Sequence, residues 1–381
     1  MSVLPKEPET YEVSPLEEFE KDSSDNEELP INNFQFVTEK KVDTGEVYIL
    51  HIAATFETSC KIVVGTSKNE CNLYHLGENQ LAKIETISDS SVIGVQFNSE
   101  NSDLFYCGSR ESIKLWDLRS PQKSVLEFSE TKKDDKPLTC FEVSPNNRLI
   151  TAGTELHNGE AFMLFWDVRN VNLMGGYWDT HADTVTQVRF DKNDENKLMS
   201  GSVDGLINIF DLKHTAEEDA LLDTFNTESS IEQLVWFNKK GKDCIGCITH
   251  TSDIQLWSTD DTEPYAHFRR QDVTKAMKVT SRLIENKFKK KTLQRKSEAH
   301  CYVVSAHRKL TDGLLVLAGA TSKNKEHLKC MSAKKELECL GTLVESNQRV
   351  RSSFFNLYHN ILLTGGESGL LNVWNVDNKL L

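Results

Sequence analysis

The chain has 381 residues and a formal net charge of −14 at pH 7, a length that allows one extended all-β unit or two or three ordinary domains. Its longest clean apolar run, LLVLAGA at 314–320, is too short to span a bilayer, and its start has no basic region followed by an apolar stretch, so neither a membrane protein nor a secretory leader is expected. Nine cysteines without a regular spacing favour a reduced, intracellular compartment, cytoplasmic or nuclear.

Residues 1–30 are much more acidic than the rest of the chain. They contain ten Asp or Glu and two Lys, a net charge of −8 that leaves −6 for the remainder, together with four of the eight prolines. Because so few apolar residues cannot offset the entropy of the chain, we predict a disordered acidic tail before a domain at 31–381. Within it, SPLEEFEK at 14–21 has helix-start signals and would form a helix only on a partner; a solvated tail is the alternative.

From residue 46 onward a similar unit recurs. Each copy has an alternating apolar strand, a turn, a strand rich in Gly or Ser, a tight turn and a strand that ends in an aromatic residue. A period of about 40–45 residues with four short strands is typical of propeller blades. The clearest copy covers 181–213, others cover 90–119, 137–169, 229–258 and 348–376, and degenerate copies cover 46–76 and 299–331.

The pairs WDLR at 116–119 and WDVR at 166–169, with the copies around them, resemble the WD-repeat family. The resemblance covers roughly 45–376 and implies an all-β, seven-bladed β-propeller. Since only about five residues follow Val376, the alternating segment FQFVTEKKV at 34–42 is expected to supply the outer strand of the last blade and close the ring.

The family resemblance also implies which residues support the blades. In WD repeats the tryptophan packs between sheets and donates a hydrogen bond toward a Ser or Thr, a His and a turn Asp. The copy at 181–213 keeps the polar partners but has Phe210, which has no N–H, in place of tryptophan. Structural roles are therefore predicted for His181, Ser200, Asp204, Trp116, Trp166, Trp257 and Trp374.

The fold does not require Arg119 and Arg169. Consecutive Trp-Asp-x-Arg motifs resemble the docking signature of WD-repeat substrate receptors that attach to the damaged-DNA-binding adaptor of cullin-four ubiquitin ligases. This resemblance implies a partner-binding site on one rim, formed by Arg119 and Arg169 with Asp117 and Asp167. In the alternative interpretation, each arginine caps its own blade or pairs with a nearby carboxylate.

A basic segment at 269–296 interrupts this acidic chain, with eleven Lys or Arg against Asp272 and Glu285, a net charge of +9. A connection this long is functional or disordered. A solvated insert, which can fold back on the acidic tail, is the expected form, and the alternatives for its core are a nuclear-import address or an RNA-facing patch. Against RNA binding, Phe288 is the one aromatic residue in the basic run. The core residues are Lys287, Lys289, Lys290, Lys291, Arg295 and Lys296.

The sequence has no pattern that favours an enzyme. CIGC at 244–247 resembles half a zinc site, but residues three apart on a strand point to opposite faces, so no metal site is expected. No catalytic residues, cofactor or small-molecule substrate are predicted. The predicted function is a non-catalytic scaffold for other proteins, in its most specific form a receptor on a ubiquitin-ligase adaptor; a nuclear or RNA-associated assembly factor is the competing hypothesis.

Overall fold

A computed structural model describes residues 33–57, 60–78, 80–88, 91–130, 136–277, 301–322 and 325–377. The predicted tail at 1–30 with its short helix, and the basic core at 287–296, lie outside the described residues.

The described chain forms seven four-stranded antiparallel sheets, each built from strands that are consecutive in the sequence except at the closure. Blade 1 comprises β2 (Ile49–Ala54), β3 (Cys60–Thr66), β4 (Glu70–Leu76) and β5 (Leu81–Ser88); blade 2 comprises β6 (Val92–Phe97), β7 (Leu104–Ser109), β8 (Ser112–Asp117) and β9 (Leu126–Ser129). Blade 3 comprises β10 (Leu138–Val143), β11 (Leu149–Thr154), β12 (Met163–Asp167) and β13 (Asn172–Tyr177); blade 4 comprises β14 (Val185–Phe190), β15 (Lys197–Ser202), β16 (Leu206–Asp211) and β17 (Leu221–Asn226), with α1 (Glu217–Ala220) before β17. Blade 5 comprises β18 (Ile231–Lys239), β19 (Lys242–Thr249), β20 (Ile254–Ser258) and β21 (Ala266–Phe268); blade 6 comprises β22 (Cys301–Arg308), β23 (Leu314–Ser322), β24 (Lys325–Ala333) and β25 (Leu337–Leu343). Blade 7 comprises β26 (Val350–Asn356), β27 (Ile361–Gly366), β28 (Leu370–Val376) and β1 (Phe34–Lys41).

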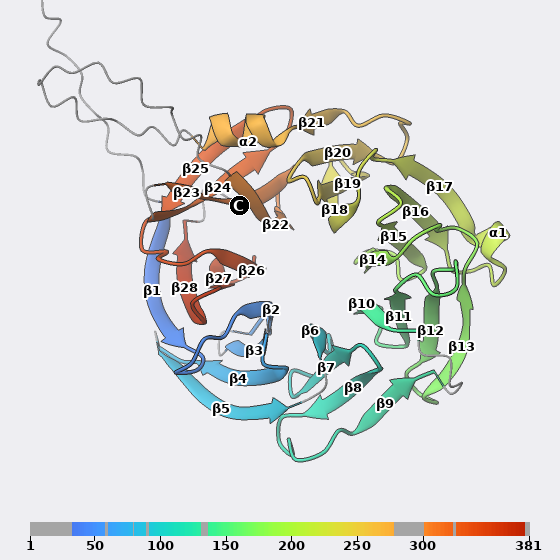
Figure 1. Ribbon diagram of the computed structural model, residues 1–381, viewed down its shortest axis with the longest axis horizontal. Helices are drawn as coiled ribbons and strands as arrows, with labels where there is room; N and C mark the ends of the chain where they lie inside the picture. Colours follow the sequence, from blue (N-terminus) through green and yellow to red (C-terminus); the bar gives the residue numbers. More distant parts are fainter. Residues whose placement is uncertain are drawn as a thin grey trace, which may run out of the picture. The chain divides into compact units, whose positions relative to one another are not determined.

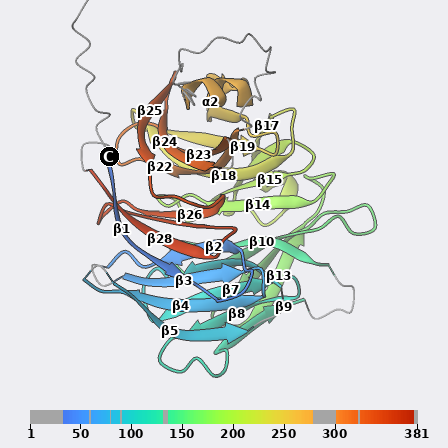
Figure 2. The same cartoon turned by 60° about the vertical axis from the view of Figure 1, so that its left-hand side comes forward.

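The seven sheets are arranged in a ring, with the first strand of each blade nearest the centre and the fourth strand at the outside (Figure 1). The predicted seven-bladed propeller is therefore confirmed. Its closure by an N-terminal strand is confirmed as well, because β1 pairs antiparallel with β28 from Phe34 opposite Val376 to Lys41 opposite Leu370. Figure 2 shows the two strands side by side, and the pairing leaves β28 without an open edge.

Alternating side chains give each sheet two apolar faces, and each face packs on a neighbouring blade. The buried apolar residues accordingly form seven clusters, one for each interface between adjacent blades. Strand β19 is an example, since Cys244 packs between blades 5 and 6 whereas Cys247, three residues later, packs between blades 4 and 5. The core of this ring is thus the set of contacts between blades.

The four predicted structural tryptophans are buried, but their indole N–H groups differ in what they contact. Trp374 donates to Thr364 Oγ1 at 3.0 Å, within its own blade. Trp257 donates to Gln255 Oε1 at 3.2 Å, and Trp166 donates to the backbone carbonyl of Ser129 in the preceding blade at 3.3 Å. The indole N–H of Trp116 has no hydrogen-bond partner among the described residues. Packing rather than a common polar network therefore holds these blades together.

Blade 4 contains a hydrogen-bond network around His181. Its Nδ1 lies 3.0 Å from Asp204 Oδ2 and its Nε2 lies 2.7 Å from Ser200 Oγ. Asn208 extends the network, since its Nδ2 lies 3.3 Å from His181 Nε2 and also donates to the carbonyl of Thr180. Asn208 thus contributes a side-chain amide to a blade in which Phe210 offers no indole N–H.

We expect Ser200→Ala to destabilise the ring by about 1–3 kcal/mol, because it removes a partner of the buried His181 ring without replacing the hydrogen bond. Urea unfolding of the purified chain measures this change. Ser120→Ala, in an exposed turn, is the control and is expected to change the free energy of unfolding by less than about 0.5 kcal/mol. Equal stability of the two variants would contradict a supporting role for the network.

The segment predicted as a basic insert from 269 onward begins differently in the structure. Residues Arg270–Ala276 form helix α2, and Val273 and Met277 are buried in the cluster between blades 5 and 6. Arg270 donates from Nε to the carbonyl of Cys301 at 2.7 Å, which ties the helix to β22. Two apolar side chains at helical spacing thus make 270–277 a part of the propeller, and the sequence interpretation placed the start of the insert too early.

Candidate functional site

One side of the ring presents two turns from each blade. In a sheet of consecutive antiparallel strands, the turn between the first and second strands and the turn between the third and fourth lie at the same edge. We call this side of the propeller the hairpin face. Arg119 follows β8 and Arg169 follows β12, so both lie in the turn between the third and fourth strands of adjacent blades.

The first predicted docking arginine is held by its own aspartate. Asp117 Oδ1 accepts hydrogen bonds from the backbone N and from Nε of Arg119, both at 2.9 Å, and Asp117 Oδ2 accepts one from Nη2 at 2.6 Å. Asp103, in the β6–β7 turn, approaches Arg119 Nε at 3.8 Å. This bidentate contact fixes the plane of the guanidinium group.

The second arginine repeats this arrangement in blade 3. Asp167 Oδ1 accepts from the backbone N and from Nε of Arg169 at 2.9 and 3.0 Å, and Asp167 Oδ2 accepts from Nη2 at 2.8 Å. Both arginine side chains are 66% exposed. Each arginine side chain is therefore paired with an aspartate and is still largely exposed to solvent.

Hydrogen bonds from the arginines keep both aspartates negatively charged. The side-chain hydrogen bonds of Arg119, followed by its backbone N–H, lower the pKa of Asp117 to about 2. The same contacts from Arg169 lower the pKa of Asp167 to about 2. Each Asp–Arg unit is thus a permanent ion pair at neutral pH, with its outer donors facing solvent.

A third unit of this kind lies in blade 4, and the sequence interpretation missed it. The backbone N of Lys213 donates to Asp211 Oδ1 at 3.1 Å, and its Nζ lies 3.9 Å from Asp211 Oδ2. The side chain of Lys213 is 63% exposed. The aromatic-Asp-x-basic spacing of FDLK at 210–213 was the available signal, but Phe and Lys replace Trp and Arg there. We call the units Asp117–Arg119, Asp167–Arg169 and Asp211–Lys213 the Asp–cation row.

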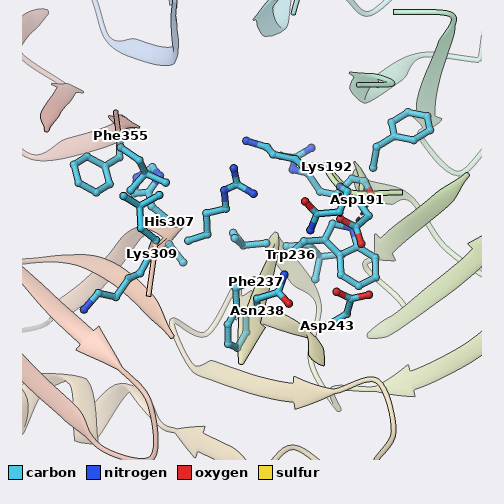
Figure 3. Close-up of a pocket in the computed structure, with 18 of the residues that line it drawn as sticks. Asp191, Lys192, Trp236, Phe237, Asn238, Asp243, His307, Lys309 and Phe355 are labelled. Atoms are coloured by element: carbon cyan, nitrogen blue, oxygen red, sulfur yellow. Dashed lines mark hydrogen bonds between the residues drawn. The ribbon is translucent and has the colours of Figure 1, made fainter. Parts of the chain in front are cut away.

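The hairpin face also holds a cavity of about 400 Å³ among the innermost strands of the ring. Its walls come from the innermost strands of several blades and from the turns that follow them, including β14, β18, β22 and β26. Figure 3 shows Lys192 extending into this space from the β14 side, opposite His307 and Phe355. The sequence interpretation did not single out these residues, although charged residues at the ends of alternating inner strands, as in VRFDK and AHRK, were a signal.

In the described part of the chain, no group of three or more His, Cys, Asp or Glu side chains is arranged to hold a metal ion. Cys244 and Cys247 lie on opposite faces of β19, so they do not converge. Over the same residues, no helix has the length and apolar character needed to cross a bilayer.

Comparison with known proteins gives one family match and several relatives. The family model "WD domain, G-beta repeat" matches residues 175–211. The chain is 32% identical over 157 residues to the uncharacterized WD repeat-containing protein C63.06 of Schizosaccharomyces pombe, covering 40% of this chain and 46% of that protein. It is 27% identical over 236 residues to WD repeat-containing protein GTS1 of Arabidopsis thaliana, covering 61% and 58%.

A third relative is the WD repeat-containing protein 89 homolog of Dictyostelium discoideum, which is 25% identical over 192 residues, covering 48% of this chain and 50% of that protein. By its segments FWDVRN, THADTVTQVRF and SGSVDGLINIFDL the chain resembles WD repeat-containing protein 89, and this match confirms the resemblance. The chain spans about half the length of these curated relatives.

Proposed function

Because the chain belongs to the WD-repeat family, we propose that it is a non-catalytic scaffold for protein–protein interactions and that one partner docks on the hairpin face. The observation that carries this proposal is the repetition of one contact in two adjacent blades. Arg119 and Arg169 have the same three hydrogen bonds to their aspartates and the same exposure. Two identically held guanidinium groups form a repeated surface feature that a partner can recognise.

The most specific form of this proposal is a substrate receptor that docks on a cullin-four ubiquitin-ligase adaptor. The support for this form is the pair of Trp-Asp-x-Arg motifs and the way in which an aspartate holds each of their arginines. Each aspartate fixes Nε and Nη2, so the remaining donors are oriented before a partner arrives and little side-chain entropy is lost on binding. Planar donors of this kind suit carboxylate or carbonyl groups on the partner.

We expect the double variant Arg119→Ala, Arg169→Ala to bind the purified adaptor at least ~100-fold more weakly than the natural chain, about tenfold per arginine. Surface plasmon resonance with the full chain immobilised measures the change. Because both side chains are exposed, the variant should keep the melting temperature of the natural chain.

Lys213→Ala is the matched control, since Lys213 occupies the equivalent turn of blade 4 but lacks a guanidinium group. It should change adaptor affinity by less than about threefold. Unchanged adaptor binding by the double arginine variant would reject the ligase proposal. Loss of other captured proteins in the same variant would still support a scaffold that uses this face.

The competing hypothesis of a nuclear or RNA-associated factor rests on the basic core at 287–296 and stays a prediction of the sequence. Deletion of 282–296 is expected to abolish nuclear accumulation or RNase-sensitive capture of partners if that core acts as proposed. Fluorescence microscopy and affinity capture with and without RNase measure the two effects. Capture and localisation identical to those of the natural chain would reject the hypothesis.

A further inference from the structure

We propose that the channel mouth on the hairpin face is a second binding site, which takes an acidic peptide segment carrying an aromatic or aliphatic side chain. We define the channel mouth by three cations, Arg189, Lys192 and Arg308, and by an apolar rim of Phe56, Leu310 and Tyr358. All six line the cavity of about 400 Å³. The site is separate from the Asp–cation row and does not depend on it.

Arg189 and Lys192 come from blade 4, and Arg308 comes from blade 6. The guanidinium group of Arg189 donates a hydrogen bond from Nη1 to the backbone carbonyl of Val188 at 2.6 Å. Lys192 lies in the β14–β15 turn and Arg308 at the end of β22. None of the ion pairs within the described ranges includes any of these three side chains. Glu142 acts electrostatically on Arg189 and Lys192, but the three cations outnumber this carboxylate and give the concave site a positive potential.

The acidic groups in the wall are engaged elsewhere. The carboxylate of Glu142, on β10, accepts a hydrogen bond from the backbone N of Phe190, and burial raises its pKa against the opposing charges of Arg189 and Lys192. Asp191 accepts from the backbone N of Asn193 at 2.9 Å. Asp243 pairs with Lys197 at 2.9 Å. An incoming carboxylate would therefore compete with Glu142 alone among these three acids for Arg189 and Lys192, and Arg308 has no ion pair within the described ranges.

The charges of Lys192 and its neighbours oppose one another. Partial loss of hydration lowers the pKa of Lys192, and the positive charge of Arg308 lowers it further. The carboxylate of Glu142 opposes this shift, and Arg189 adds a smaller lowering effect. A bound anion would relieve this repulsion and stabilise the protonated lysine. The arrangement thus favours an acidic ligand over a neutral one.

The apolar rim adds a second requirement. Phe56, Leu310 and Tyr358 are 47%, 61% and 65% exposed, and all three line the same cavity. The rings of Phe56 and Tyr358 are 5.6 Å apart in an edge-to-face contact, and Lys192 Nζ lies 5.9 Å from the centre of the Phe56 ring. Cationic and apolar surfaces therefore adjoin, and a ligand that buries both needs carboxylates next to an apolar side chain.

A peptide fits these features better than a nucleic acid. A long polyanion is held by extended basic surface, whereas this chain carries a net charge of −14 and the three cations are gathered in one cavity. A phosphate group alone would leave the apolar rim in water. An acidic segment of a partner protein, with one large apolar residue, satisfies both parts of the mouth.

The test is fluorescence anisotropy with the full chain and a short fluorescein-labelled peptide in which glutamates surround one phenylalanine and one leucine. We expect saturable binding that weakens with salt. Replacing the glutamates by glutamine, or the two apolar residues by serine, should weaken it at least ~10-fold in each case. Inositol hexakisphosphate and a short single-stranded RNA are the competitors, and neither should displace the peptide at equal concentration.

Two double variants locate the site. Lys192→Ala with Arg308→Ala, and Phe56→Ser with Tyr358→Ser, should each weaken peptide binding at least ~10-fold, with melting temperatures reported alongside. Lys213→Ala and the double variant Arg119→Ala, Arg169→Ala should bind the peptide normally, which separates this site from the proposed adaptor site. The proposal is overturned if folded mouth variants bind as tightly as the natural chain, if the glutamine peptide binds equally well, or if RNA or inositol hexakisphosphate displaces the peptide.

Discussion

Removal of residues 1–42 will unfold the ring or make it aggregate, whereas removal of residues 1–30 will leave it folded. The longer deletion takes away β1 and exposes the backbone edge of β28 along a register that runs from Val376 to Leu370. It also removes Phe34 and Val42, two buried side chains that each contribute about 1.5–3 kcal/mol by leaving water. Because β1 belongs to blade 7 and leads directly into blade 1, its removal takes away the strand that holds these two blades together.

Thermal unfolding followed by circular dichroism, with size-exclusion chromatography of the same samples, distinguishes the two truncations. The chain that begins at residue 31 should elute as a compact species and melt at the temperature of the full chain. The chain that begins at residue 43 should show a lower melting temperature by at least ~5 °C or elute as aggregate. Identical melting curves for both truncations would show that β1 does not close the ring.

Acidification from pH 7 to pH 4 will destabilise the fold through two largely buried histidines, by up to about 3 kcal/mol each. Burial lowers the pKa of His51 to about 4, against a raising effect of a backbone contact at Val92. Burial lowers the pKa of His307 to about 4, and the charge of Lys192 acts in the same direction. The Nε2 of His307 lies 2.7 Å from Ser353 Oγ.

The sign of the effect follows from proton binding. In the unfolded chain a histidine takes up its proton near pH 6.5, whereas the folded chain resists protonation until about pH 4. Between these values the unfolded state binds more protons, so stability is full above pH 6.5 and falls as the pH decreases toward 4. A shift of about 2.5 pH units corresponds to about 3 kcal/mol for each histidine. Asp117 and Asp167 lose their favourable charge only at lower pH, because their pKa values are about 2.

Urea unfolding at a series of pH values between 7 and 4 measures this slope. His307→Gln and His51→Gln should each flatten it, because glutamine keeps hydrogen-bonding capacity without titrating. His214→Gln, at an exposed position, is the control and should leave the slope unchanged. A free energy of unfolding that stays constant from pH 6.5 to pH 4 in the natural chain, or equal slopes in all three variants, would contradict the prediction.

Much of the fold was predictable because propeller blades are local in sequence. Each sheet is built from strands that follow one another, so the alternation in VTQVRF and the Gly-rich second strands already indicate their positions. The closing strand was predictable from a missing partner at the end of the last blade. Helix α2 was not predictable from the sequence, because Val273 and Met277 are buried only through the contact between blades 5 and 6.

The candidate site was likewise predictable only in part. The paired arginines were found by motif, since Asp and Arg two residues apart in one turn contact each other wherever the blade lies. The equivalent Lys213 was overlooked because its blade has Phe210 in place of tryptophan. The contacts of each indole N–H, from Thr364 to the carbonyl of Ser129, depend on details of the neighbouring strands that the repeat pattern does not contain.

By itself the sequence determined the number of blades, the strand that closes them and the turns that carry the Asp–Arg pairs, because all three depend on residues close together in the chain or on a repeat visible along it. Only the tertiary structure brought Lys192, Arg308 and Phe56 to one cavity. They belong to blades 4, 6 and 1, and their proximity depends on how all the sheets pack around the ring. Such long-range packing is a property of the whole circle of interfaces and leaves no local pattern in the amino-acid order.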